Sequence, residues 1–131
     1  MAKERVLFVC LHGAAKSVLA AKHFERLARA RGLAVEAAFV GTEPDPEIAP
    51  RVARELAAEG IDVAGLRPSR VTAADVASAS RIVSFGCDLG ALGPGAPVER
   101  WDDVPAVSDG YEAARAAIDA RVARLVDELA R

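Results

Sequence analysis

The stretch VLFVC at residues 6–10, followed directly by LHGAAKS at residues 11–17, decides the fold. Five apolar residues without alternation are typical of a strand buried on both faces. The strand carries the thiol of Cys10 to its carboxyl end, and a short loop of small residues then leads into a helical pattern. Backbone N–H groups converge at such a junction, and the helix dipole adds partial positive charge there. The stretch therefore predicts an oxyanion-binding loop beside a thiol.

Cys10 is the candidate nucleophile of this loop. A helix N-terminus favours the thiolate, which is the nucleophilic form of cysteine. The alternative is a buried core cysteine, a common fate of this residue, but the position just before the loop favours the reactive interpretation. The residues predicted to surround the oxyanion are Leu11, His12, Gly13, Ala14, Ala15, Lys16 and Ser17.

Three side chains of the loop differ in what they could contribute. Lys16 would hold the anion as a single point charge, without the planar fork of an arginine. Ser17 would cap the helix, tune the thiolate, or do both. His12 is predicted to have a peripheral role, because a loop side chain acts as a base only within hydrogen-bond reach of the reacting groups.

Length and composition limit the class of protein. The 131 residues fit a single domain, expected to span residues 1–131. A formal net charge of −2 provides no electrostatic basis for binding nucleic acid or an anionic membrane. No apolar run is long enough for a membrane span, and the run at 6–10 is too short for a signal peptide, so a cytoplasmic location is expected. Two cysteines make no disulfide framework, and no Cys/His cluster has metal-ligand spacing, so neither metal nor cofactor is expected.

Strand and helix patterns alternate along the chain, which indicates a parallel sheet with helices on both faces. The predicted class is α/β, a three-layer α-β-α domain with a small four-stranded parallel sheet. Ligands bind such sheets at the carboxyl ends of the strands. The predicted elements are strand 5–10, helix 17–31, strand 33–40, loop 42–49, helix 50–60, irregular chain 61–71, a short helix after a Thr72–Asp75 capping box, strand 81–86, loop 88–97, strand 98–101 and a final helix capped by Asp109 with Glu112.

The loop resembles a known motif. Cys-x5-Arg-Ser after a first strand is the phosphate loop of the low-molecular-weight protein tyrosine phosphatases and of the arsenate reductases that share their fold. The spacing from Cys10 to Ser17 is the same, but Lys16 stands at the arginine position. Ser17 matches the family hydroxyl that bonds the thiolate. Gly13 stands where the family usually has a left-handed Asn, a conformation that glycine reaches without steric cost.

The resemblance extends over essentially the whole chain and implies the low-molecular-weight phosphatase-like fold. It departs from the family pattern near residue 102, where the family's acid loop carries Asp-Pro, because no aspartate there directly precedes a proline. Asp102 or Asp103 would then supply the catalytic acid; the alternative is that both are turn acids, which are frequent beside proline. The segments that look like those of arsenate reductases are 41–44 (GTEP), 60–63 (GIDV), 85–88 (FGCD) and 101–103 (WDD).

Cys87 has two interpretations. It is either a small apolar residue at a strand end or a resolving thiol for Cys10. The thioredoxin-linked arsenate reductases use two cysteines besides the nucleophile, and Cys87 is the one additional cysteine in this sequence.

The favoured function is arsenate-reductase-like, because the segments outside the loop resemble that group. Cys10 would be arsenylated, and Cys87, an external low-molecular-weight thiol or a thioredoxin-type reductant would then release arsenite. A phosphatase would instead hydrolyse a phosphocysteine and would need an acid for the leaving group. The third alternative is a non-catalytic binder of an oxyanion (phosphate, arsenate or sulfate) or of a phosphoprotein, or a thiol redox sensor.

Overall fold

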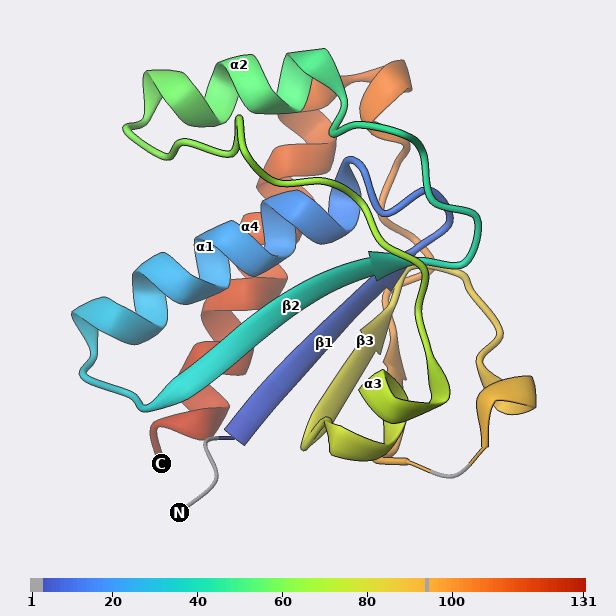
Figure 1. Ribbon diagram of the computed structural model, residues 1–131. Helices are drawn as coiled ribbons and strands as arrows, with labels where there is room; N and C mark the ends of the chain where they lie inside the picture. Colours follow the sequence, from blue (N-terminus) through green and yellow to red (C-terminus); the bar gives the residue numbers. More distant parts are fainter. Residues whose placement is uncertain (1–3, 94) are drawn as a thin grey trace.

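The computed structural model describes residues 4–93 and 95–131, and four parallel strands form its sheet. The spatial order is β2-β1-β3-β4, so β1 lies between β2 and β3 (Figure 1). The predicted α/β class with a four-stranded parallel sheet is confirmed. The strands are β1 (Glu4–Cys10), β2 (Val35–Gly41), β3 (Arg81–Ser84) and β4 (Val98–Arg100).

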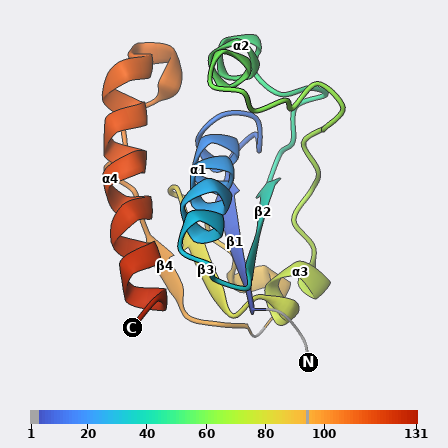
Figure 2. The ribbon, with the colours of Figure 1, turned by 90° about the vertical axis from the view of Figure 1, so that its left-hand side faces the viewer.

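Helices cover both faces of the sheet. Two of them, α1 and α4, pack on one face, while the short α3 lies on the other (Figure 2). Alternation along β1 sends Phe8 and Cys10 toward α1, whereas Leu7 and Val9 pack against α3. The helices are α1 (Lys16–Ala30), α2 (Pro50–Ala58), α3 (Ala73–Ser78) and α4 (Tyr111–Leu129).

Local signals in the sequence predicted one helix start correctly and one wrongly. The capping box is present at α3, where the Thr72 hydroxyl and the Asp75 carboxylate each accept the other's backbone N–H. Asp109 does not cap α4. A short 3-10 turn over Val107–Asp109 takes up that residue instead, and α4 follows Gly110 with no side-chain cap.

Strand β3 is shorter than predicted, because it ends at Ser84 rather than at residue 86. The chain turns sharply there: the Ser84 hydroxyl accepts the N–H of Cys87 and donates to the Cys87 carbonyl, both at 2.8 Å. Gly86, inside this turn, has φ +87°, which a residue with a side chain rarely adopts. Cys87 therefore lies beyond the strand, in the turn at its carboxyl end.

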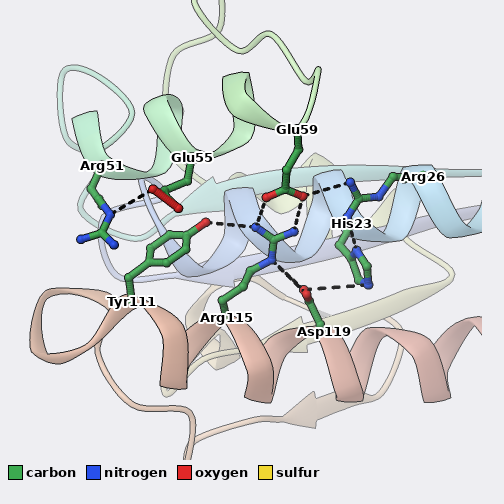
Figure 3. Close-up of polar contacts among 8 residues, drawn as sticks. All are labelled: His23, Arg26, Arg51, Glu55, Glu59, Tyr111, Arg115 and Asp119. Atoms are coloured by element: carbon green, nitrogen blue, oxygen red, sulfur yellow. Dashed lines mark hydrogen bonds and ion pairs between the residues drawn. The ribbon is translucent and has the colours of Figure 1, made fainter.

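An ion-pair network joins α2 to α1 and α4 (Figure 3). Glu59, next to the end of α2, accepts two hydrogen bonds of 2.7 Å from Arg115 of α4 and one of 3.0 Å from Arg26 of α1. Arg115 also donates to the Tyr111 hydroxyl and to Asp119. These hydrogen bonds, led by those from Arg115, lower the pKa of Glu59 to about 2. The network thus joins the C-terminal end of α2 to α1 and α4.

In the part of the chain that the structure describes, no helix has the length and apolar character needed to cross a membrane. The same residues contain no group of His, Cys, Asp or Glu side chains able to hold a metal ion.

Candidate active site

Cys10 lies at the carboxyl end of β1 and is 6% exposed. Its Sγ is 3.0 Å from the Oγ of Ser17, a fully buried residue in the first turn of α1. The cap position of that helix is Ala15, which offers no side-chain bond, so the Ser17 hydroxyl is directed at the sulfur. A hydroxyl donor at this distance stabilises a thiolate more than a neutral thiol.

The loop folds against the end of β2. Gly13 has φ +62°, the left-handed conformation expected at this position. A Cβ atom built on Gly13 would lie 2.8 Å from the backbone nitrogen of Gly41, and one on Gly41 would lie 2.6 Å from that of Gly13. The two backbones are in contact, so a side chain at either position would collide with the other segment.

Main-chain hydrogen bonds also brace the loop from outside. The N–H groups of four residues after β2 donate to its carbonyls, at distances between 2.7 and 3.3 Å. Carbonyls used in this way face away from the loop interior, which leaves its N–H groups for an anion. The donor and acceptor pairs are Thr42 to Cys10, Glu43 to Leu11, Asp45 to His12 and Ala49 to Ala14.

A cavity of about 610 Å³ opens beside Cys10. The oxyanion loop forms one wall, the start of α2 another, and the segment before α4 a third. Asp45 is the one carboxylate among the lining residues, and Lys16 and Arg51 are the cations. The lining residues are Cys10, Leu11, His12, Ala14, Ala15, Lys16, Asp45, Ala49, Pro50, Arg51, Phe85, Ala106, Val107 and Ser108.

The ammonium group of Lys16 binds a carbonyl. Its Nζ donates a 2.9 Å hydrogen bond to Val104, in the segment after β4. The Val104 carbonyl therefore competes with the predicted anion for the ammonium group of Lys16. All side-chain hydrogen bonds of a lysine start from one nitrogen at the end of a flexible chain, whereas a guanidinium can bind two partners side by side.

Both aspartates considered as the catalytic acid point toward arginines. Asp102 accepts a 2.9 Å hydrogen bond from Arg100, and Asp103 is bound by Arg121. Neither aspartate lines the cavity, whose wall on that side consists of Ala106, Val107 and Ser108. The structure therefore does not bring these carboxylates together with Cys10.

Cys87 is on the other face of the sheet from Cys10. It packs with Leu7, Val9 and Leu89, whereas Cys10 packs with the residues under α1. Burial raises the pKa of Cys87 above its ordinary value, and a 4.0 Å contact with the Thr42 hydroxyl opposes this in part. Cys87 is thus held as a neutral thiol, and its role as a resolving thiol remains a prediction.

The lining residues outside the loop were not predicted as site residues, among them the charged Asp45 and Arg51. The guanidinium of Arg51 lies 4.8 Å from the centre of the Tyr111 ring and forms ion pairs with Glu55 and Glu112. One signal could have pointed to Asp45, because it follows the carboxyl end of the second strand, the edge at which parallel sheets bind ligands.

The sequence matches a family model described as "Low molecular weight phosphotyrosine protein phosphatase" over residues 5–88, and the chain belongs to this family. A search of curated proteins finds no match to it. The family defines a domain for oxyanion chemistry.

Solved structures of both kinds of enzyme share the fold. A thioredoxin-dependent arsenate reductase of Corynebacterium glutamicum superposes with a TM-score of 0.77 at 23% identity; the match covers 96% of this chain and 61% of that one. An arsenate reductase in a phosphate-binding state superposes with a TM-score of 0.71 at 20% identity, and the match covers 95% of this chain and 98% of that one. The tyrosine phosphatase Wzb of Escherichia coli K30, in complex with sulphate, superposes with a TM-score of 0.78 at 13% identity. That match covers 98% of this chain and 99% of the phosphatase. At these identities the likeness shows the fold.

We expect iodoacetamide at neutral pH to alkylate Cys10 and leave Cys87 unmodified. Cys10 lines the cavity, with its Sγ 3.0 Å from the Ser17 hydroxyl, whereas burial raises the pKa of Cys87 and keeps it protonated. Peptide mass spectrometry over a time course measures both sites in one sample. Sulfate should slow the reaction at Cys10 alone, and equal modification of the two thiols would contradict the assignment.

Proposed function

We propose that this protein performs covalent chemistry on a tetrahedral oxyanion at Cys10, with arsenate as the preferred substrate. The contact between Cys10 and Ser17 carries the proposal, because it favours a nucleophilic sulfur at the mouth of an anion-binding loop. The relatives with phosphate or sulphate in their structures support the class of ligand.

The wall formed by residues 106–108 supports arsenate over a phosphate ester. The wall at Ala106, Val107 and Ser108 has no carboxylate, so a proton for an alcohol or phenol leaving group has to come from another wall of the cavity. Arsenate loses a hydroxyl of its own, so the departing group is water and no bulky leaving group has to meet an acid there.

The reaction then has two steps. The Cys10 sulfur displaces one arsenate hydroxyl, forming a sulfur–arsenic bond, and the hydroxyl takes up one proton and leaves as water. A second thiolate next attacks the Cys10 sulfur, the sulfur–arsenic bond breaks, and its electron pair reduces arsenic to arsenite as a disulfide forms. The location of Cys87 on the opposite face of the sheet favours an external thiol, since the cavity beside Cys10 is open to one.

The test is arsenite formation from arsenate with excess dithiothreitol, run for the parent protein, Cys10→Ser and Cys87→Ser. We expect turnover in the parent, none in Cys10→Ser, and turnover in Cys87→Ser because the external thiol completes the cycle. Loss of turnover in Cys87→Ser would assign the resolving thiol to Cys87. No arsenite from the parent, with release of phosphate from an aryl phosphate, would make the protein a phosphatase.

The hydrogen bond from Lys16 to Val104 favours a second candidate, a non-catalytic binder of oxyanions or phosphoproteins. A lysine held by a carbonyl stabilises the extra charge of a transition state poorly, whereas the backbone of the loop still binds the ground-state anion. A stable complex with phosphate or a phosphopeptide, without turnover of arsenate or an aryl phosphate, would support this candidate.

We expect Lys16→Arg to raise turnover with an aryl phosphate while leaving phosphate affinity nearly unchanged. A guanidinium has five donors in a planar fork, enough to keep the Val104 contact and reach two oxygens of the anion. A gain of about 10-fold corresponds to one additional hydrogen bond of about 1.4 kcal/mol to the transition state. Steady-state rates and phosphate protection of Cys10 measure the two quantities. Loss of phosphate binding would mean that the loop is built around lysine.

A further inference from the structure

We infer that His12, oriented by Asp45, is the proton donor of this site, an inference that rests on Cys10 being the nucleophile. Apart from His12 and Asp45, no described residue that lines the cavity has a carboxyl or imidazole group that could donate this proton. The wall at residues 106–108 has no acid, and both Asp102 and Asp103 are bound to arginines outside the cavity. His12 and Asp45 both line the cavity together with Cys10.

The hydrogen bonds of His12 select its tautomer. Its Nδ1 lies 3.1 Å from the carbonyl oxygen of Glu43 and 3.3 Å from Oδ1 of Asp45. Both of these are acceptors, so Nδ1 carries hydrogen and Nε2 is the nitrogen that gains or loses the exchangeable proton. Within residues 4–93 and 95–131, Nε2 has no hydrogen-bond partner, and it is free to serve a substrate.

Asp45 acts on this imidazole as a positioning residue. The carboxylate holds the ring in one orientation, as a carboxylate does for the histidine of a nucleophile–histidine–aspartate triad. The backbone N–H of Asp45 also donates a 3.0 Å hydrogen bond to the carbonyl of His12, so the two residues are joined through main chain as well as side chain. Their side chains are 54% and 50% exposed, which leaves His12 accessible to solvent protons between turnovers.

The proton balance is simple. When the Cys10 sulfur forms a bond to phosphorus or arsenic, the bond to the departing oxygen breaks and Nε2 of His12 gives that oxygen a proton. An aryl phosphate thus leaves as a neutral phenol, and an arsenate hydroxyl leaves as water. The imidazole, now neutral, then accepts a proton from the water that hydrolyses a phosphocysteine and returns to its starting state.

The experiment compares two leaving groups of different basicity. Phenyl phosphate needs protonation of the departing oxygen, whereas 4-nitrophenyl phosphate expels a weakly basic phenolate with little help. We expect His12→Gln to lower the rate of phosphocysteine formation by about 10²-fold for phenyl phosphate and by less than about 10-fold for 4-nitrophenyl phosphate. Asp45→Asn should show the same selectivity with a smaller loss, and Glu47→Gln, an exposed acid in the same segment, should change neither rate.

Rapid quench and mass spectrometry of the Cys10 adduct measure both rates. Equal losses for the two esters in His12→Gln would overturn the inference, since a merely structural role cannot distinguish the leaving groups. Absence of any adduct in the parent protein would overturn it as well. The arsenate assay is independent: a protein that reduces no arsenate but shows the leaving-group selectivity confirms the role of His12 and contradicts the choice of substrate.

Discussion

Gly41→Ala is expected to displace the oxyanion loop from its position against β2. The new Cβ would lie 2.6 Å from the nitrogen of Gly13 and 2.7 Å from the carbonyl carbon of His12, and neither backbone atom can move without shifting the loop. Overpacking of this kind costs about 3 kcal/mol, the upper part of the usual range. A loop displaced by about 1 Å also loses about 10²-fold in rate at Cys10.

Thermal unfolding and sulfate protection of Cys10 from alkylation measure the two losses. Gly65→Ala is the matched control, because nothing lies within 4 Å of its added Cβ; its free energy of unfolding should stay within about 0.5 kcal/mol of the parent. If Gly41→Ala unfolds at the parental temperature and keeps its sulfate protection, the loop and β2 are not in contact.

Arg115→Gln is expected to give the largest loss of stability among the charged residues. Its side chain is 13% exposed and binds Glu59, Asp119 and Tyr111 at once, so the substitution removes three contacts together, although Glu59 keeps its hydrogen bond from Arg26. The expected cost is about 2 kcal/mol, because both partner carboxylates are about a third exposed and solvent screens the ion pairs. Differential scanning calorimetry measures it. Arg31→Gln removes an exposed pair with Asp127 and should cost less than about 1 kcal/mol.

The same network predicts how stability depends on pH. The folded-state pKa of Glu59 is about 2, below its ordinary value of 4.5, so the unfolded chain binds the proton first. The stabilisation is therefore complete above pH 4.5 and is lost as the pH falls from 4.5 toward 2. Because a third of the Glu59 side chain is exposed, solvent screening reduces the contribution to about 1–2 kcal/mol. In Arg115→Gln the slope of stability over this interval should be shallower, and an unchanged slope would contradict the assignment.

The sequence predicted the Cys10 loop well because its structure is local. The strand, the left-handed Gly13 and the contact between Cys10 and Ser17 all arise within a few consecutive residues, where spacing determines geometry. The order of strands and helices likewise predicted a parallel sheet, since few other arrangements bury such strands on both faces.

The remaining parts of the site depend on contacts between distant segments. Lys16 binds Val104, which is 88 residues later in the chain, and spacing within a loop does not determine where a flexible side chain ends. The pairing of β1 with β2 brings Asp45 to His12. Cys87 was predicted at the correct edge of the sheet, but the turn at Gly86 decides which face its side chain occupies.

The brace between residues 42–49 and the oxyanion loop consists of main-chain hydrogen bonds, and this has a consequence for divergence within the family. The side chain of Asp45, which lines the cavity, takes no part in those bonds, so this residue can mutate while the loop keeps its shape. Substrate preference can therefore change through such a mutation without destabilising the fold, and no second, compensating mutation is needed. Such a segment is a natural place to randomise when a new specificity is selected from this scaffold.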